Sequence, residues 1–188
     1  MTINPKAKIS LIIIISAAVL FAAFSATGKT VMKTLYPMKY TEYVEKYSAE
    51  YSVDPELVYA VIKTESSFNS DAVSYANAEG LTQIIPETFD WLKMRLGEED
   101  ENLSLFDPET SIKYGTYFLS YLLDEYENTD TAIAAYHAGV GNVNGWLEDK
   151  SISPDGKTLS EIPISETAHY VEKVNKALNI YYNLYKEG

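Results

Sequence analysis

Helix signals dominate the chain from Thr41 onward. No segment keeps the strict alternation of apolar and polar residues that a half-buried strand requires, and the only short strand-like run is Leu81–Ile85. Elsewhere apolar side chains recur at helical spacing. The clearest apolar helical face is formed by Leu57, Val58, Val61 and Ile62. This pattern predicts a mostly α domain.

Residues that start and stop helices divide this region. Asp-Pro pairs at 54–55 and 107–108 each place an N-capping acid before a proline at the first helical position. Pro86 opens another helix, which Gly97 closes. The expected helices span residues 42–51, with Thr41 as the N-cap, 55–66, 86–96, 108–126, 131–138 and 166–186.

The last two helices have weaker signals. Asp130 is the expected N-cap of helix 131–138, which Gly139 and Gly141 are expected to end. Ser165 is the expected N-cap of the final helix. Loops are expected over residues 69–80, 98–105, 139–145 and 150–163.

An uncharged apolar run, Ile9–Ala26, follows Lys6 and Lys8. At ~1.5 Å per residue a helix of this run would be ~27 Å long, just enough for a bilayer core of ~30 Å. The run favours a transmembrane anchor over its main alternative, a signal peptide cleaved near Ala26. We therefore expect an anchor or signal over residues 1–28, a linker over 29–40, and a single domain over 41–188. That domain would lie outside the cytoplasm, at the cell membrane or secreted.

Composition and charge exclude several kinds of site and partner. The chain has no cysteine, which excludes disulfides, thiolate zinc sites and a cysteine nucleophile, and its two histidines are too few for an all-histidine metal site. Residues 1–40 hold five lysines and no acid, so the remainder carries 10 basic and 27 acidic residues, a net charge of −17. Such a domain repels phosphate backbones, so we expect no nucleic-acid partner. A substrate should be neutral, or cationic in places.

One carboxylate continues an apolar stripe. Steps of four residues lead from Leu57 to Val61 and then to Glu65, at the C-terminus of the expected helix. Partial burial and the negative end of the helix dipole both raise the pKa of a carboxyl group. A carboxyl that stays protonated near neutral pH suits a general acid. The alternative is a glutamate that frays into solvent from the last turn.

Glu65 begins the first of several short motifs that follow one another in order along the chain. They are Glu-Ser-Ser-Phe at 65–68, Glu-Gly-Leu-Thr-Gln-Ile at 79–84, Ala-Tyr-His-Ala-Gly at 135–139, and Ile-Pro at 162–163 with Glu166-Thr167 and Tyr170-Val171 after it. This ordered set resembles the soluble lytic transglycosylase family, over about Thr41 to Tyr185. The resemblance implies a lysozyme-like α fold, close to that of goose-type lysozymes, and an enzyme that cleaves the glycan strands of peptidoglycan.

The resemblance also implies roles for particular residues. Glu65 matches the family's single catalytic acid/base. The residues that match substrate-binding or cleft positions are Ser74, Gln83, Tyr136, Glu166 and Tyr170. Three features depart from the family pattern: Thr82 stands where Met is usual, His137 stands where Asn is usual, and the loop at 77–79 is larger and less neutral.

The family mechanism needs no metal or organic cofactor. One carboxyl group protonates the bond between N-acetylmuramic acid and N-acetylglucosamine, then removes a proton from the muramyl 6-hydroxyl, which leaves a 1,6-anhydro end. The nearest alternative is a hydrolase with the same fold and a second carboxylate, for which Asp71 and Glu79 are the candidates. Another is a non-catalytic glycan-binding protein. The sequence indicates peptidoglycan strands as the partner, with the membrane at the N-terminus, and points to no protein partner.

Overall fold

The computed structural model describes residues 28–186, which fall into two compact units that divide after Pro37. In the first unit, residues 28–35 are helical, within the segment expected as a linker. The apolar run Ile9–Ala26 lies outside the described residues. Among residues 28–186, no helix combines the length and the apolar character that crossing a membrane requires.

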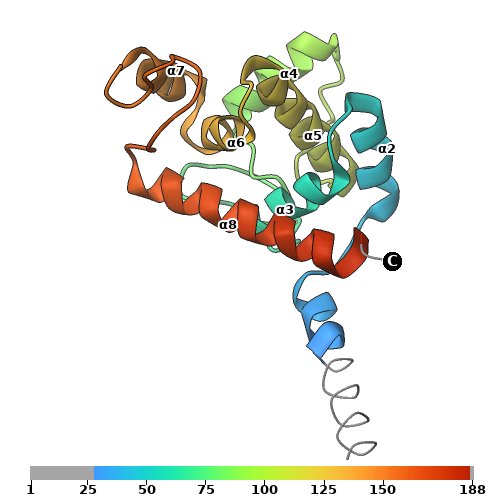
Figure 1. Ribbon diagram of the computed structural model, residues 1–188. Coiled ribbons are helices and arrows are strands. Elements are labelled where there is room, and N and C mark those ends of the chain that lie inside the picture. Colours follow the sequence, from blue (N-terminus) through green and yellow to red (C-terminus); the bar gives the residue numbers. More distant parts are fainter. Residues whose placement is uncertain (1–27, 187–188) are drawn as a thin grey trace, which may run out of the picture. The chain divides into compact units, whose positions relative to one another are not determined.

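The second unit is a bundle of helices (Figure 1). Its elements are α2 (Thr41–Tyr51), α3 (Pro55–Glu65), α4 (Pro86–Leu96), α5 (Pro108–Glu125), α6 (Thr129–Ala138), α7 (Val140–Glu148), α8 (Ser165–Tyr181) and a final π-helical turn, η1 (Tyr182–Lys186). Between residues 38 and 186, extended pairing is limited to isolated bridges that join Glu79 to Val73 and to Ile84. The prediction of a mostly α domain is confirmed, and Leu81–Ile85 forms a turn rather than a strand.

Most helix starts follow the local signals in the sequence. The Asp54 side chain accepts a hydrogen bond from the backbone N–H of Glu56, and that of Asp107 accepts one from Thr110. Three caps differ from the prediction. Tyr40 and Ile164, rather than Thr41 and Ser165, precede α2 and α8, and neither side chain forms a capping hydrogen bond. The cap of α6 also differs. Asn128, rather than Asp130, accepts from the backbone N–H of Thr131 at 3.0 Å, so the helix begins two residues earlier.

The loop predicted over residues 139–145 is wrong, because a helix, α7, occupies it. Gly139 has φ 85° and ends α6, but the chain turns back into a helix at the next residue. Tertiary contacts outweigh the poor helix propensity of this glycine-rich segment. Val143 is completely buried, and Asn144 accepts a hydrogen bond from the hydroxyl of Tyr126 at 2.8 Å.

Helix α3 forms the centre of the second unit. It packs against α8 and α2, and Figure 1 shows α8 running past the ends of both α3 and α6. Every residue from Leu57 to Ile62 is buried, so α3 is enclosed on all sides rather than along one face. Its C-terminal residue, Glu65, is therefore held in place by a rigid, buried helix.

Candidate active site

Glu65 ends α3 beside a cavity of about 500 Å³. The hydroxyl of Tyr170, on α8, donates a hydrogen bond to Glu65 Oε1 at 2.6 Å. This is the sole hydrogen bond that the Glu65 carboxyl group receives within residues 28–186. The carboxyl group is thus fixed through Oε1 while its residue lines the cavity.

The environment of Glu65 changes its acidity. Burial raises the pKa of Glu65 from 4.5 to about 7, and the hydrogen bond from Tyr170 partly opposes that rise by stabilising the anion. The predicted raised pKa is confirmed. At neutral pH such a carboxyl group is present in both forms, so it can give up a proton and take one back.

The turn that contains Gln83 forms one wall of the cavity. Its side-chain NH₂ group donates to the carbonyl oxygens of Ala72 at 3.1 Å and Gly80 at 3.0 Å, which orients the side chain. Gln83 itself has φ 50°, in the left-handed region that non-glycine residues rarely adopt. The hydroxyl of Ser66 donates to the carbonyl oxygen of Leu81 at 2.9 Å, which ties this turn to the end of α3.

Two residues of the same turn, Gly80 and Thr82, lie in tight contact with neighbouring parts of the chain. Gly80 has φ 74°, and a Cβ atom there would lie 1.9 Å from the carbonyl oxygen of Leu105. Thr82 is buried, and its hydroxyl donates to the carbonyl oxygen of Ser111 at 2.9 Å. A Cβ atom at Gly115 would lie 2.4 Å from Thr82 Cγ2, so Thr82 fits tightly against α5. Thr82, which stands where the family usually has Met, therefore attaches the turn to α5.

Ser74 lines the cavity from the loop before this turn. Its hydroxyl oxygen accepts from the backbone N–H groups of Ala76 at 3.2 Å and Ala78 at 3.0 Å. The oxygen therefore shapes the loop, while the hydroxyl proton is left to donate to a ligand.

The two tyrosines of the motifs have different places. Tyr136 lines the cavity, and its hydroxyl donates to the carbonyl oxygen of Thr82 at 2.7 Å. Tyr170 is buried behind Glu65 and does not line the cavity. Burial and the negative charge of Glu65 raise the pKa of both hydroxyls well above the ordinary value, so both stay protonated donors.

Glu166 and His137 complete the rim. Glu166, in the first turn of α8, is exposed and lines the cavity. His137 also lines it, with Nδ1 3.1 Å from the Thr167 hydroxyl and its ring stacked on Tyr170 at 4.5 Å between centroids. Burial lowers the pKa of His137, and the carboxylate of Glu166 opposes that shift.

Sequence reasoning missed several residues of the cavity. His137 was noticed only as a departure from a motif, and the fully exposed side chain of Tyr75 lies in a loop that gave no specific signal. Thr88 on α4 and Phe118 on α5 also line the cavity. Nothing in the sequence groups these two with Glu65, because only the packing of the helices brings them together.

The acidic candidates for a second catalytic group lie elsewhere. Neither Asp71 nor Glu79 lines the cavity, and Glu166 is the carboxylate that lines it together with Glu65. The part of the chain from 28 to 186 contains no cluster of three or more His, Asp or Glu side chains arranged to hold a metal ion. The site therefore presents a half-buried acid, Glu65, an exposed carboxylate at its rim, Glu166, and a set of neutral hydrogen-bonding groups.

Comparisons with known proteins agree with this geometry. The family model described as "Transglycosylase SLT domain" matches residues 42–158. A membrane-bound lytic murein transglycosylase C of Glaesserella parasuis is 32% identical over 169 residues, which cover 78% of this chain and 46% of that protein. The soluble lytic murein transglycosylase of Escherichia coli K12 is 32% identical over 154 residues, which cover 80% of this chain and 24% of that protein.

Solved structures show the same fold. The 70 kDa soluble lytic transglycosylase of Escherichia coli matches with a TM-score of 0.71 at 28% identity, over 81% of this chain and 25% of that one. An inactive mutant of the lytic transglycosylase Slt from Pseudomonas aeruginosa matches with a TM-score of 0.69 at 28% identity, over 79% and 24%. The chain belongs to the transglycosylase SLT domain family. It spans less than half the length of these relatives.

Proposed function

We propose that this chain is a peptidoglycan lytic transglycosylase. It cleaves the β-1,4 bond between N-acetylmuramic acid and N-acetylglucosamine without water and leaves 1,6-anhydro ends. The observation that carries the proposal is Glu65, a single carboxyl group with a pKa of about 7, held by Tyr170 at the edge of the cavity. The names of the similar proteins, lytic murein transglycosylases, support the same activity.

In the first step, protonated Glu65 donates its proton to the glycosidic oxygen. The bond from that oxygen to the muramyl C1 breaks, and an oxocarbenium-like centre forms at C1 with help from the neighbouring N-acetyl group. In this mechanism the sugars are held by hydrogen bonds to Gln83, Ser74 and Glu166, a role supported by their place in the cavity lining. Tyr136 fixes the turn that carries Gln83.

In the second step, anionic Glu65 removes the proton from the muramyl 6-hydroxyl. The 6-oxygen then bonds to C1 and closes the anhydro ring, and Glu65 ends protonated as it began. The Tyr170 hydroxyl stabilises the anion between the two steps through its hydrogen bond to Oε1. These steps use no metal and no organic cofactor.

A hydrolase is the main alternative. It would place water on the opposite face of the sugar with a second carboxylate, about 6.5–9.5 Å from the first in an inverting enzyme. Glu166 lines the cavity, whereas Asp71 and Glu79 do not, so such a mechanism would need Glu166 as its second carboxylate. Glu166 is exposed in the first turn of α8.

Product mass separates the two reactions, because anhydro and hydrated ends differ by one water. We expect wild type and the variants Asp71→Asn, Glu79→Gln and Glu166→Gln all to give anhydro ends from purified glycan strands. Asp71→Asn and Glu79→Gln should also keep most of the activity, since neither side chain lines the cavity. Hydrated ends from wild type, with loss of cleavage in Glu166→Gln, would identify a hydrolase instead.

We also propose that Ile9–Ala26 anchors the protein in the cell membrane. In this arrangement residues 1–28 form the anchor, 29–40 the linker and 41–188 the catalytic domain outside the cytoplasm. The membrane-bound relative from Glaesserella parasuis supports a location at the membrane. Full-length protein should appear in the membrane fraction, with its N-terminus intact on sequencing. A soluble form that begins near Ala26 would show that the run is a cleaved signal.

A further inference from the structure

Arg95 is the only arginine of the chain, and it lies near the C-terminus of α4. Its guanidinium carbon is 5.1 Å from the ring centre of Trp91 and 4.7 Å from that of Tyr121, on α5. Its Nε group donates to the hydroxyl of Tyr117 at 3.4 Å, a long hydrogen bond. Three aromatic side chains thus fix the position of this exposed cation.

The guanidinium group has no anionic partner among residues 28–186. Lys46, Lys93, Lys113 and Lys157 all pair with carboxylates, but no carboxylate lies within ion-pair distance of Arg95. Its terminal NH₂ groups make no hydrogen bond in that part of the chain. The guanidinium carbon lies over the Trp91 and Tyr121 rings, and the two terminal NH₂ groups are left to bind a carboxylate through two parallel hydrogen bonds.

This cation is continuous with the cavity. Thr88, Trp91 and Arg95 are spaced three and four residues apart, so they lie on one face of α4, and Thr88 lines the cavity. On α5, Phe118 also lines the cavity and contacts Trp91 at 6.3 Å between ring centres. Contacts between aromatic side chains therefore connect the cavity wall, through Phe118 and Trp91, to Arg95.

The distance from the cavity to Arg95 matches the length of a short peptide attached to a glycan strand. From Thr88 to Arg95 the helix advances ~10 Å, at ~1.5 Å per residue. An extended peptide covers that distance in about three residues, at ~3.3–3.6 Å each. The glycan strands of peptidoglycan carry short peptides, the stems, on their muramic acid residues, and these peptides contain free carboxylates.

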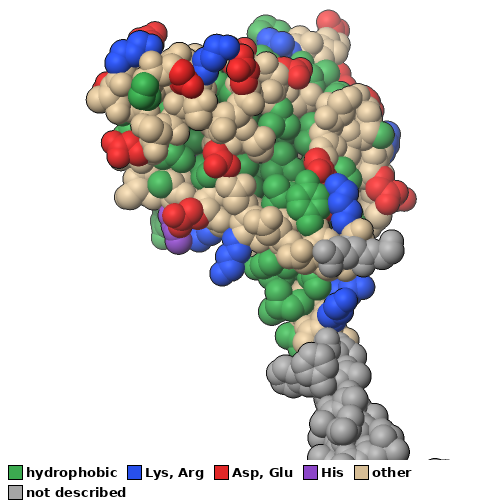
Figure 2. Space-filling view, in the orientation of Figure 1, with side chains coloured by type: hydrophobic (Ala, Val, Ile, Leu, Met, Phe, Trp, Pro, Cys, Tyr) green, Lys and Arg blue, Asp and Glu red, His purple; other side chains and the backbone are tan. Residues whose placement is uncertain are grey.

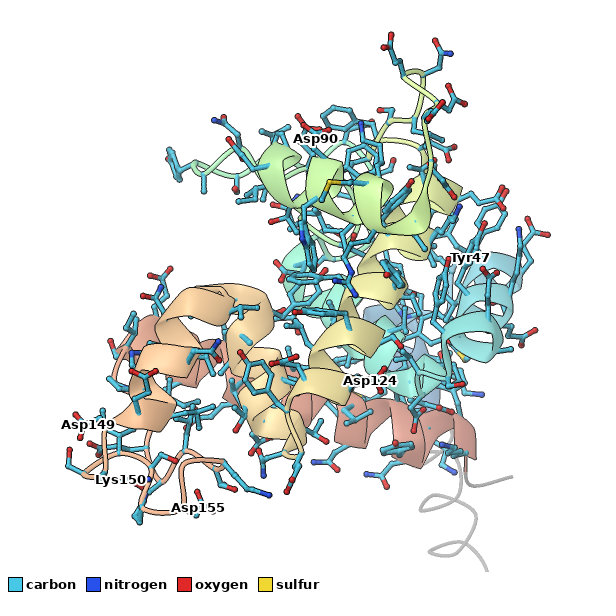
Figure 3. All side chains as sticks on the ribbon, turned by 90° about the horizontal axis from the view of Figure 1, so that it is seen from above. Tyr47, Asp90, Asp124, Asp149, Lys150 and Asp155 are labelled. Carbon is cyan, nitrogen blue, oxygen red and sulfur yellow. The ribbon has the colours of Figure 1, made fainter. Side chains whose placement is uncertain are left out.

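We propose that Arg95, with Trp91 and Tyr121 beneath it, binds a carboxylate of the stem peptide while the glycan lies in the cavity. The proposal rests on the proposed function for its substrate class. Charge supports it: the visible face in Figure 2 carries many acidic side chains, and the domain from residue 41 has a net charge of −17. A carboxylate needs a local cation to bind such a surface. In Figure 3 the label on Asp90, the residue before Trp91, marks α4, the helix that carries Arg95.

The test compares Arg95→Gln with wild type on three substrates: glycan strands with free stem carboxylates, the same strands with those carboxylates amidated, and strands with the stems removed. We expect KM for the free-carboxylate strands to rise by about fivefold in the variant, with kcat unchanged, the range for a partly exposed ion pair with fork geometry. KM for the other two substrates should stay the same. Arg95→Lys should recover only part of the loss, because an ammonium group cannot form the fork.

Lys93→Gln is the matched control, since it removes a positive charge from the same helix at a side chain that pairs with Asp90. It should change no KM value. An equal rise of KM on all three substrates for Arg95→Gln would show that the residue only supports the aromatic packing. No rise on free-carboxylate strands would equally overturn the proposal.

A binding measurement separates this proposal from the proposed activity. Calorimetric titration of the detergent-solubilised full chain carrying Glu65→Gln, with the three kinds of strand, measures binding without turnover. Tighter binding of free-carboxylate strands, lost when Arg95→Gln is added, would support the carboxylate site even if the wild-type products disproved a transglycosylase. Equal binding of free and amidated strands by the Glu65→Gln chain would overturn the site whatever the reaction.

Discussion

Glu65→Gln is expected to lower the rate of glycan cleavage by at least about 100-fold and to leave the fold intact. One general acid/base role typically contributes ~10²–10⁴ to a rate, and the proposed mechanism gives Glu65 both proton transfers. Glutamine has nearly the same shape and can still accept the hydrogen bond from Tyr170, so the packing around α3 should persist. Cleavage is measured by release of anhydro-ended products from purified strands.

The control for this loss is a matched charge change away from the cavity. Glu101→Gln removes a carboxylate from an exposed loop and should retain wild-type cleavage. The Glu65→Gln protein should also still bind glycan strands, because its cavity wall is unchanged. Retention of more than about a tenth of wild-type turnover by a folded Glu65→Gln protein would contradict the acid/base role.

The same substitution is expected to change how stability depends on pH. In wild type the folded state holds the Glu65 proton more tightly than the unfolded state, since the pKa rises from 4.5 to about 7 on folding. The free energy of unfolding therefore contains a contribution that is complete below pH 4.5 and is lost as the pH rises to about 7. Its size is about 3 kcal/mol, at ~1.4 kcal/mol per pKa unit.

Glu65→Gln cannot titrate, so it should lack this decline. We expect the free energy of unfolding of the variant to increase, relative to that of wild type, by about 3 kcal/mol between pH 4.5 and pH 8. Urea unfolding at a series of pH values measures the difference, and Glu101→Gln controls for the change in net charge. Parallel curves for wild type and Glu65→Gln over this range would show that Glu65 is not buried as a neutral acid.

Several helix boundaries were predictable because their causes are local. The caps at Asp54 and Asp107 each need only a side chain and a backbone N–H group two or three residues away. The stripe from Leu57 to Glu65 follows from helical geometry alone, and it placed the carboxyl group correctly at the end of a buried helix.

Helix α7 shows where local reasoning fails. Its glycines favour a loop, and the segment becomes helical because Val143 is buried and Asn144 is bound by Tyr126. The predicted start of α6 is wrong for a smaller reason. Two polar residues that lie two positions apart, Asn128 and Asp130, can both serve as caps, and the sequence does not rank them.

Helical periodicity and short motifs were enough to predict the helical class, the place of Glu65 at the end of a buried stripe, and the family resemblance. The side chains that surround that acid could be identified only from the packing of the helices. Tyr170 lies behind Glu65 rather than in the cavity, His137, Thr88 and Phe118 line the cavity, and Asp71 and Glu79 do not. The reason is physical: a periodic pattern fixes which face of a helix is buried, whereas the neighbours of that face depend on how distant helices pack.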